Sequence, residues 1–227
     1  MNNVCFNIFG MRRSGNHAIL HWVADHFNTK PWLIHNTSFN KPNPEEDFYE
    51  HEDFYDYRNE DFNVDRDVLI QTFEDCDITN LDWKANAEVV GKSVMQFNMI
   101  IIRDPLNWLA SRYAKPEWPA VKITPQIIDF WNQHYKECMG WTSYLKRPIV
   151  VSYNMMVKKP DCLESVEDDM FMSPSGIKIK PGMGIGSSFN DEDYLNRWKK
   201  FENDPTFMKL ANDLPYRNID GINEYFE

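Results

Sequence analysis

A glycine-containing loop near the N-terminus holds the first residues that could bind a phosphate group. The segment GMRRSGNH covers residues 10–17, and its two glycines have the G-x-x-x-x-G spacing of a phosphate-binding loop. Such a loop points successive backbone N–H groups inward at the positive end of the following helix. Asn16 and His17 replace the Lys and the Ser or Thr that hold phosphates and Mg²⁺ in nucleotide hydrolases. We therefore expect the loop to bind a phosphate without an obligatory metal; the alternative is an ordinary glycine turn with two surface arginines.

A second segment, IIIRDPLNWLASRY at residues 100–113, places an arginine directly after an apolar stretch. Arg103 is expected at the carboxyl end of a central strand, where open α/β sheets bind ligands. Ser111 follows eight residues later, on a helix that Asp104 caps and Pro105 begins. A guanidinium and a hydroxyl together suit a tetrahedral oxyanion such as a phosphate. The alternative is that Arg103 pairs with a neighbouring carboxylate and that Ser111 has no such role.

Apolar stretches typical of strands alternate with helical patterns along the chain, which predicts the fold class. The expected strands are residues 4–9, 31–35, 68–72, 99–102 and 148–153, and the expected helices are residues 16–27, 105 onward, 125 onward, 191–201 and 205–214. This order predicts a single α/β domain over residues 1–227, with three layers, α/β/α, around a central, mainly parallel sheet of about five strands, as in P-loop NTPases. An acidic, aromatic-rich insertion at about residues 43–67 is expected to be a solvated excursion or, alternatively, a lid over an acceptor.

The composition disfavours several classes of partner. Asp and Glu outnumber Lys and Arg by 35 to 24, a formal net charge of −11, whereas duplex nucleic acid requires a broad basic face. The four cysteines contain no CxxC pair, and no group of His, Cys and carboxylates has metal-ligand spacing, so we expect buried thiols and no metal. No apolar run approaches the roughly 18 residues of a membrane span, and no signal peptide is visible. We therefore expect a soluble, cytoplasmic protein with neither a nucleic acid nor a membrane as its partner.

Together the two motifs resemble those of sulfotransferases that use 3′-phosphoadenosine 5′-phosphosulfate (PAPS). In that family the first strand leads into a loop of the type K/R-S-G-T/N, which residues 13–16, Arg-Ser-Gly-Asn, match. A later strand of the family ends in an Arg that is followed eight residues on by a Ser, as Arg103 and Ser111 are here. The family's strand ending in Tyr and its C-terminal glycine loop are similar to IVVSYNMMVKKP (149–160) and GMGIGSSF (182–189).

The resemblance implies PAPS as the sulfuryl donor, without a metal, and assigns its contacts. The loop would hold the 5′-phosphosulfate, and Arg103 with Ser111 would hold the 3′-phosphate. The donor-binding residues are then expected to be Arg12, Arg13, Ser14, Gly15, Asn16, His17, Arg103, Ser111, Gly186, Ser187 and Ser188. Arg13 stands in place of the family's usual lysine, so it would offset charge on the leaving phosphate but would be a poor proton donor.

The resemblance also implies a general base, a His or Glu that follows the strand after the 5′-loop unit. By position Glu74 is the first candidate and Asp75 the next. His17 and His35 are alternatives, because each follows a core strand and a histidine titrates near neutral pH. Each candidate also has a structural alternative, either a helix-start carboxylate that the helix dipole favours or a hydrogen-bonded core histidine.

The expected function is therefore transfer of a sulfuryl group from PAPS to an acceptor hydroxyl, or an amine, by in-line displacement. The acceptor is expected to be a small molecule or a glycan, with a peptide tyrosine also open, because acceptor pockets are built from variable loops. Two alternatives stay open: a nucleotide or small-molecule kinase on the same scaffold, and a non-catalytic nucleotide-binding protein. The sequence predicts no oligomeric state.

Overall fold

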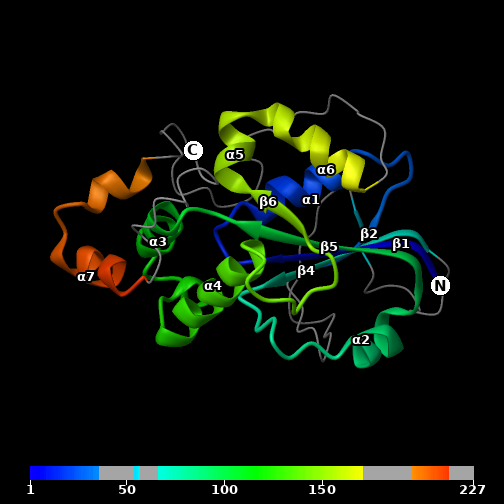
Figure 1. Ribbon diagram of the computed structural model, residues 1–227, viewed down its shortest axis with the longest axis horizontal. Coiled ribbons are helices and arrows are strands. Elements are labelled where there is room, and N and C mark those ends of the chain that lie inside the picture. The colour runs from blue at the N-terminus through cyan, green and yellow to red at the C-terminus, as the bar shows by residue number, and fades with distance from the viewer. Residues whose placement is uncertain (36–53, 57–65, 171–195, 215–227) are drawn as a thin grey trace.

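A parallel sheet of six strands forms the centre of the computed structural model, which describes residues 1–35, 54–56, 66–170 and 196–214 (Figure 1). In chain order the strands are β1 (Asn2–Gly10), β2 (Trp32–Ile34), β3 (Tyr55–Asp56), β4 (Arg66–Glu74), β5 (Ser93–Ile102) and β6 (Ile149–Ser152). Their spatial order is β3-β2-β4-β1-β5-β6, and every neighbouring pair is parallel. β1 therefore lies between the two other long strands, β4 and β5.

Helices cover both faces of this sheet and complete the three layers (Figure 1). One face carries α1 (Asn16–Ala24), α5 (Tyr153–Lys158) and α6 (Leu163–Asp169), and the other carries α2 (Trp83–Val90), α3 (Pro105–Tyr113) and α4 (Pro125–Cys138). α7 (Pro205–Asp213) packs against α3 beyond the end of the sheet. The short 3₁₀ helices are η2 (Pro119–Val121), η3 (Pro160–Cys162) and η4 (Arg197–Phe201). Within the described ranges, no helix combines the length and the apolar character needed to cross a membrane.

Side chains of the central strands alternate between two cores. Phe6 and Ile8 of β1 pack in the core that includes α1, whereas Phe9 packs in the core that includes α3 and α4. Ile101 and Ile100 of β5 divide between the two cores in the same way. Because both faces are buried, these strands read in the sequence as continuous apolar runs.

The predicted fold class is confirmed, and all five expected strands are present. The sheet has one further strand, β3, which lies within the acidic stretch at 43–67; apart from residues 54–56 and 66–67, that stretch is outside the described residues. β5 begins at Ser93, well before its expected start, and α2, α5 and α6 were not expected. Tyr153, expected to end a strand, begins α5 instead.

Four buried amide side chains form a hydrogen-bonded chain across the sheet. Asn7 Nδ2 donates to Asn98 Oδ1 at 3.0 Å, and Gln71 Nε2 donates to Asn7 Oδ1 at 3.0 Å. Asn86 of α2 donates from Nδ2 to Gln71 Oε1 at 3.1 Å, and Asn98 Nδ2 donates to the carbonyl oxygen of Lys146 at 3.0 Å. Buried amides require such partners, so this chain ties α2 to the three central strands.

At the carboxyl end of the sheet, neighbouring strands send the chain to opposite faces. After β1 it continues into α1 on one face, whereas after β4 and β5 it continues into α2 and α3 on the other face (Figure 1). Diverging connections of this kind open a crevice at the carboxyl ends of the strands, where open α/β sheets bind ligands. The two sequence motifs both begin at this position.

Candidate functional site

The segment between β1 and α1 forms a tight turn at the N-terminus of a helix. Ser14 N donates to Met11 O at 3.0 Å, and Arg13 has a positive φ of 75°. Gly15, with a φ of 94°, then caps α1. The Ser14 side chain is buried, and its hydroxyl has no hydrogen-bond partner within the described part of the chain. A backbone turn of this kind at a helix N-terminus is suited to binding an anion.

Close packing requires both glycines of this turn. A Cβ atom at Gly10 would overlap the side chain of Asn16, and one at Gly15 would overlap the ring of Tyr153. Gly15 also has a left-handed backbone conformation that other residues rarely adopt. Glycine is therefore required at both positions by the close contact with a neighbouring side chain as well as by the turn itself.

A buried ion pair holds the loop in position. Arg112 of α3 donates to Asp75 through two nitrogens, Nη1 to Oδ1 at 2.9 Å and Nη2 to Oδ2 at 3.0 Å. Asp75 Oδ1 also accepts from the backbone N–H of Arg12 at 3.0 Å, and the Arg12 carbonyl accepts from Trp108 Nε1 at 3.1 Å. These contacts engage both oxygens of Asp75. Asp75 therefore positions the loop. Its place in the sequence made it a candidate for the general base, but these contacts make it a poor one.

Arg13, Arg103 and Ser111 are separated in the sequence and meet beside the loop. Arg13 Nε donates to Ser111 Oγ at 3.2 Å, and Arg103 Nη1 donates to the Arg13 carbonyl oxygen at 3.0 Å. The Arg103 guanidinium lies 4.8 Å from the centre of the Tyr153 ring, a cation–π distance. The structure thus brings together the three side chains that the two sequence motifs predicted as oxyanion ligands.

These arginines place two like charges close together in a buried region. Burial lowers the pKa of Arg13, and the positive charge of Arg103 lowers it further. Burial is also the main cause of the lowered pKa of Arg103, which is only 2 % exposed. An anion bound between them would offset both charges, and the burial of Arg103 would strengthen its attraction.

Asp104 has the capping role that its position before Pro105 predicts. Its Oδ1 accepts from Asn107 N at 2.8 Å, and its Oδ2 accepts from Asn154 Nδ2 at 2.9 Å. Asn154 of α5 returns a bond by accepting from Asp104 N at 3.2 Å. These bonds fix the start of α3 directly after Arg103. They therefore also fix where Ser111, on the same helix, lies relative to Arg103.

The remaining base candidates, His17, His35 and Glu74, lie together at the carboxyl edge of the sheet. Glu74 ends β4, His35 follows β2, and His17 is in the first turn of α1. One ligating atom from each side chain lies within 4.8 Å of those of the other two, and the two imidazole centres are 5.0 Å apart. The fold therefore joins into one cluster three residues that the sequence offered as alternatives.

Hydrogen bonds orient two members of this cluster. Asn16 Nδ2 donates to Glu74 Oε1 at 2.7 Å, and Arg12 Nε lies 3.4 Å from Glu74 Oε2. His35 Nδ1 is 2.8 Å from the hydroxyl oxygen of Thr72. The pKa of His35 is lowered to about 3, first by burial and then by the charges of His17 and Arg12. His35 is consequently a neutral imidazole at pH 7.

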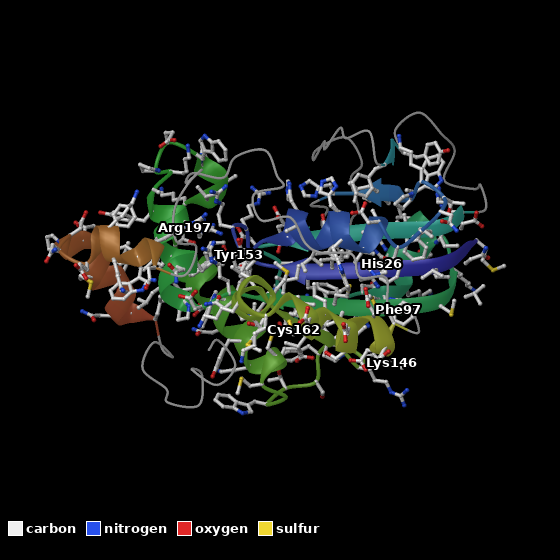
Figure 2. All side chains as sticks on the ribbon, turned by 90° about the horizontal axis from the view of Figure 1, so that it is seen from above. His26, Phe97, Lys146, Tyr153, Cys162 and Arg197 are labelled. Carbon is white, nitrogen blue, oxygen red and sulfur yellow. The ribbon has the colours of Figure 1, made fainter. Side chains whose placement is uncertain are left out.

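Some contributors to the site were not expected from the sequence. Arg112 and Trp108 are buried on α3 and contact residues that are far away in the sequence. No local sequence pattern indicates such contacts. Tyr153 was expected only as the end of a strand, but its ring packs against both Gly15 and Arg103 at this end of the sheet (Figure 2). The predicted loop at residues 186–188 lies outside the described residues.

His26 does not belong to this site. It lies just beyond the other end of α1, away from Tyr153 (Figure 2). Its Nε2 is 2.7 Å from Glu167 Oε1, and its Nδ1 is 2.7 Å from the Trp22 carbonyl oxygen. These buried contacts join α1 to α6 and have a structural role.

No protein-family profile matches the sequence, and no curated protein matches it. The mouse sulfotransferase SULT7A1 complexed with PAP is similar to the structure over 99% of this chain and 90% of that chain, with a TM-score of 0.50 and 12% sequence identity. A retinol dehydratase in a complex with retinol and PAP is similar over 100% of this chain and 77% of that chain, with a TM-score of 0.41 and 15% identity. The second score is too low to establish a shared fold. The first similarity shows that the chain has the α/β fold of this mouse sulfotransferase.

We predict that Asp75→Asn destabilises the protein by about 3 kcal/mol, because it leaves the buried Arg112 charge without its carboxylate. Urea unfolding measures this change. Glu88→Gln is the matched control, since Glu88 is a surface carboxylate whose side chain is 68% exposed, and its variant should unfold within about 0.5 kcal/mol of the original chain. Equal stability of the two variants would contradict the positioning role of Asp75.

The lowered pKa of His35 predicts a defined pH dependence of stability. Between its folded pKa of about 3 and its ordinary value of 6.5, the unfolded chain binds more protons at this residue than the folded chain does. The free energy of unfolding should therefore rise with pH through this window, by up to about 1.4 kcal/mol per pH unit from His35, and should level off above it. Urea unfolding at several pH values, compared with His35→Gln, isolates this contribution. A difference between the two chains that stays constant with pH would refute it.

Proposed function

We propose that this chain is a sulfotransferase that transfers a sulfuryl group from PAPS to an acceptor hydroxyl or amine by in-line displacement. The convergence of Arg13, Arg103 and Ser111 on a loop at the N-terminus of α1 carries the proposal. The shared fold with a mouse sulfotransferase that was solved with PAP, the desulfated form of the donor, supports it. The acceptor that we propose is a small molecule or a glycan.

The described residues fit a ligand that carries two separate anionic groups. Residues 12–17 offer backbone N–H groups at a helix N-terminus and the buried Ser14 hydroxyl, which suit the 5′-phosphosulfate. Arg103 and Ser111 suit the 3′-phosphate. When bound, PAPS supplies the sulfuryl group, and the protein supplies its orientation.

Arg13 has the electrostatic role in this mechanism. Negative charge develops on the leaving phosphate as the bond to sulfur breaks, and a fixed positive charge nearby lowers the energy of that transition state. A guanidinium keeps its charge and is therefore a poor proton donor. Its contact with Ser111 holds Arg13 in place before the reaction begins.

His35 is our first choice for the proton acceptor, ahead of Glu74. Both carboxylate oxygens of Glu74 already have partners, since Oε1 accepts from Asn16 Nδ2 and Oε2 lies 3.4 Å from Arg12 Nε. His35 is neutral, and in the tautomer whose Nδ1–H donates to the Thr72 hydroxyl, Nε2 is the atom that accepts the proton. Burial, the main cause of the lowered pKa of His35, would remain, but an anion bound at the loop would offset the charge of Arg12 and so oppose part of that lowering. His35 thus becomes a better base once the donor is bound. Glu74 was the first candidate by position in the sequence, so this assignment reverses that order.

The side chain of Asn16 argues against the kinase alternative. Asn16 occupies the position of the Walker lysine, but its amide donates to Met11 O at 3.1 Å and to Glu74. It therefore closes the loop from within instead of reaching toward a terminal phosphate. His17, at the next position, has no hydroxyl with which to hold Mg²⁺.

Calorimetric titration with PAP is the direct test of the donor site. We expect binding without Mg²⁺, and Arg103→Ala should weaken it by roughly 10- to 100-fold, because a charge-assisted hydrogen bond contributes about 1.5–3 kcal/mol. Lys84→Ala, which removes a surface cation with an 88% exposed side chain, is the control and should leave the affinity unchanged. Unchanged affinity in Arg103→Ala would refute the assignment, and a preference for Mg²⁺–ATP would favour a kinase.

The base assignment predicts a loss of turnover that leaves donor binding intact. His35→Gln should lower kcat by about 10²–10⁴-fold with an acceptor found by screening, while PAP affinity stays within about two-fold. Glu74→Gln should have the smaller effect on kcat. The opposite ranking of the two variants would restore Glu74 as the base. PAP binding without turnover on any acceptor would favour the non-catalytic alternative.

A further inference from the structure

The cluster of His17, His35 and Glu74 has the composition and spacing of a transition-metal site, and we propose that it binds one Zn²⁺ ion. Its three ligating atoms lie within 4.8 Å of one another. Zn²⁺ bonds to imidazole nitrogen and carboxylate oxygen at about 2.0–2.2 Å, which separates tetrahedral ligands by about 3.4 Å. Small side-chain rotations therefore bring all three donors to bonding distance.

The donor set selects the metal. Two imidazoles and one carboxylate are the protein ligands of many zinc sites that keep a fourth position for water or a substrate. Mg²⁺ and Ca²⁺ prefer oxygen ligands, so the two histidines disfavour both ions. The three ligands come from the ends of β2 and β4 and from the first turn of α1, elements that the sheet holds in place.

Two hydrogen bonds around the cluster have the arrangement of an outer shell. A histidine that binds a metal through one nitrogen commonly donates from the other, and His35 Nδ1 lies 2.8 Å from the hydroxyl of the buried Thr72. Metal-binding carboxylates are likewise hydrogen-bonded, and Glu74 Oε1 accepts from Asn16 Nδ2 at 2.7 Å. These bonds would orient His35 Nε2 and the Glu74 carboxylate for binding.

The sequence predicted no metal because the three ligands are far apart along the chain. Positions 17, 35 and 74 show none of the short spacings by which zinc sites are recognised. They lie side by side because β2 pairs in parallel with β4, and because α1, which carries His17, leads directly into β2.

The positive charges of Arg12 and Arg13, which both interact with Glu74, oppose the metal. Arg12 Nε lies 3.4 Å from Glu74 Oε2, and its positive charge acts on His35 as well. A dication and Arg12 would therefore compete for Glu74. Arg12→Ala is expected to strengthen Zn²⁺ binding several-fold, whereas under the proposed function the same change should weaken PAP binding.

Occupancy of this site would affect the proposed reaction. If His35 accepts the acceptor proton, bound Zn²⁺ takes the same electron pair, so Zn²⁺ should inhibit transfer and a chelator should restore it. This consequence rests on the proposed function, but metal binding itself does not. A chain that fails to bind PAP can still bind Zn²⁺, and the reverse also holds, so the two proposals fail separately.

Titration of the chain, carrying no polyhistidine tag, with Co²⁺ followed by Zn²⁺ tests the site. We expect one equivalent of Co²⁺ to give a visible d–d absorption without a thiolate charge-transfer band, and one equivalent of Zn²⁺ to remove it. His17→Asn, His35→Gln and Glu74→Gln should each weaken binding at least about ten-fold. Glu88→Gln and Cys76→Ser serve as carboxylate and thiol controls and should bind as the original chain does.

Several outcomes would overturn the proposal. These are absence of the d–d absorption at one equivalent, unchanged affinity in the three ligand variants, and loss of binding in Cys76→Ser. Circular dichroism identifies any ligand variant that does not fold. The original chain, the remaining ligand variants and Arg12→Ala then decide the question, since tighter binding in Arg12→Ala requires a folded site.

Discussion

The bidentate ion pair between Asp75 and Arg112 is the contact on which the geometry of the site depends. Through Asp75 it holds the backbone N–H of Arg12, so the loop is attached to α3 rather than only to its own helix. α3 also carries Ser111, which receives the hydrogen bond from Arg13. A buried ion pair adds little net stability but is costly to break from one side. The ion pair therefore keeps the loop and α3 in a fixed position relative to each other.

Positive charge is concentrated at the end of β1 although the chain as a whole is acidic. The formal net charge is −11, yet Arg12, Arg13, Arg103 and Arg112 all lie around one loop. Charges near the surface of a protein are screened by water and salt, whereas buried or partly buried charges are screened much less. The net charge of a protein thus affects its solubility and its encounter with large partners. It says little about which small ligand a site such as this loop binds.

The sequence predicted the features that depend on local pattern. The five main strands, the cap at Asp104 and the meeting of the two motifs follow from apolar runs, from residue preferences and from the rule that parallel strands present their carboxyl ends at one edge. It did not predict the partners of Arg112, because nothing near position 112 indicates position 75. The first half of β5 was missed since it is partly exposed and polar. The cluster at positions 17, 35 and 74 required the strand order, which the pattern alone does not give.

The amide chain through Asn7 has a consequence for how the strands find one another. Asn7 pairs directly with Gln71 on one side and with Asn98 on the other. Sliding β1 by two residues would keep its apolar side chains on the correct faces, so hydrophobic burial alone hardly opposes such an error. The same slip would leave several amides buried without partners, at about 1–3 kcal/mol each. The buried amides therefore favour the native register of β1 over one that is shifted by two residues.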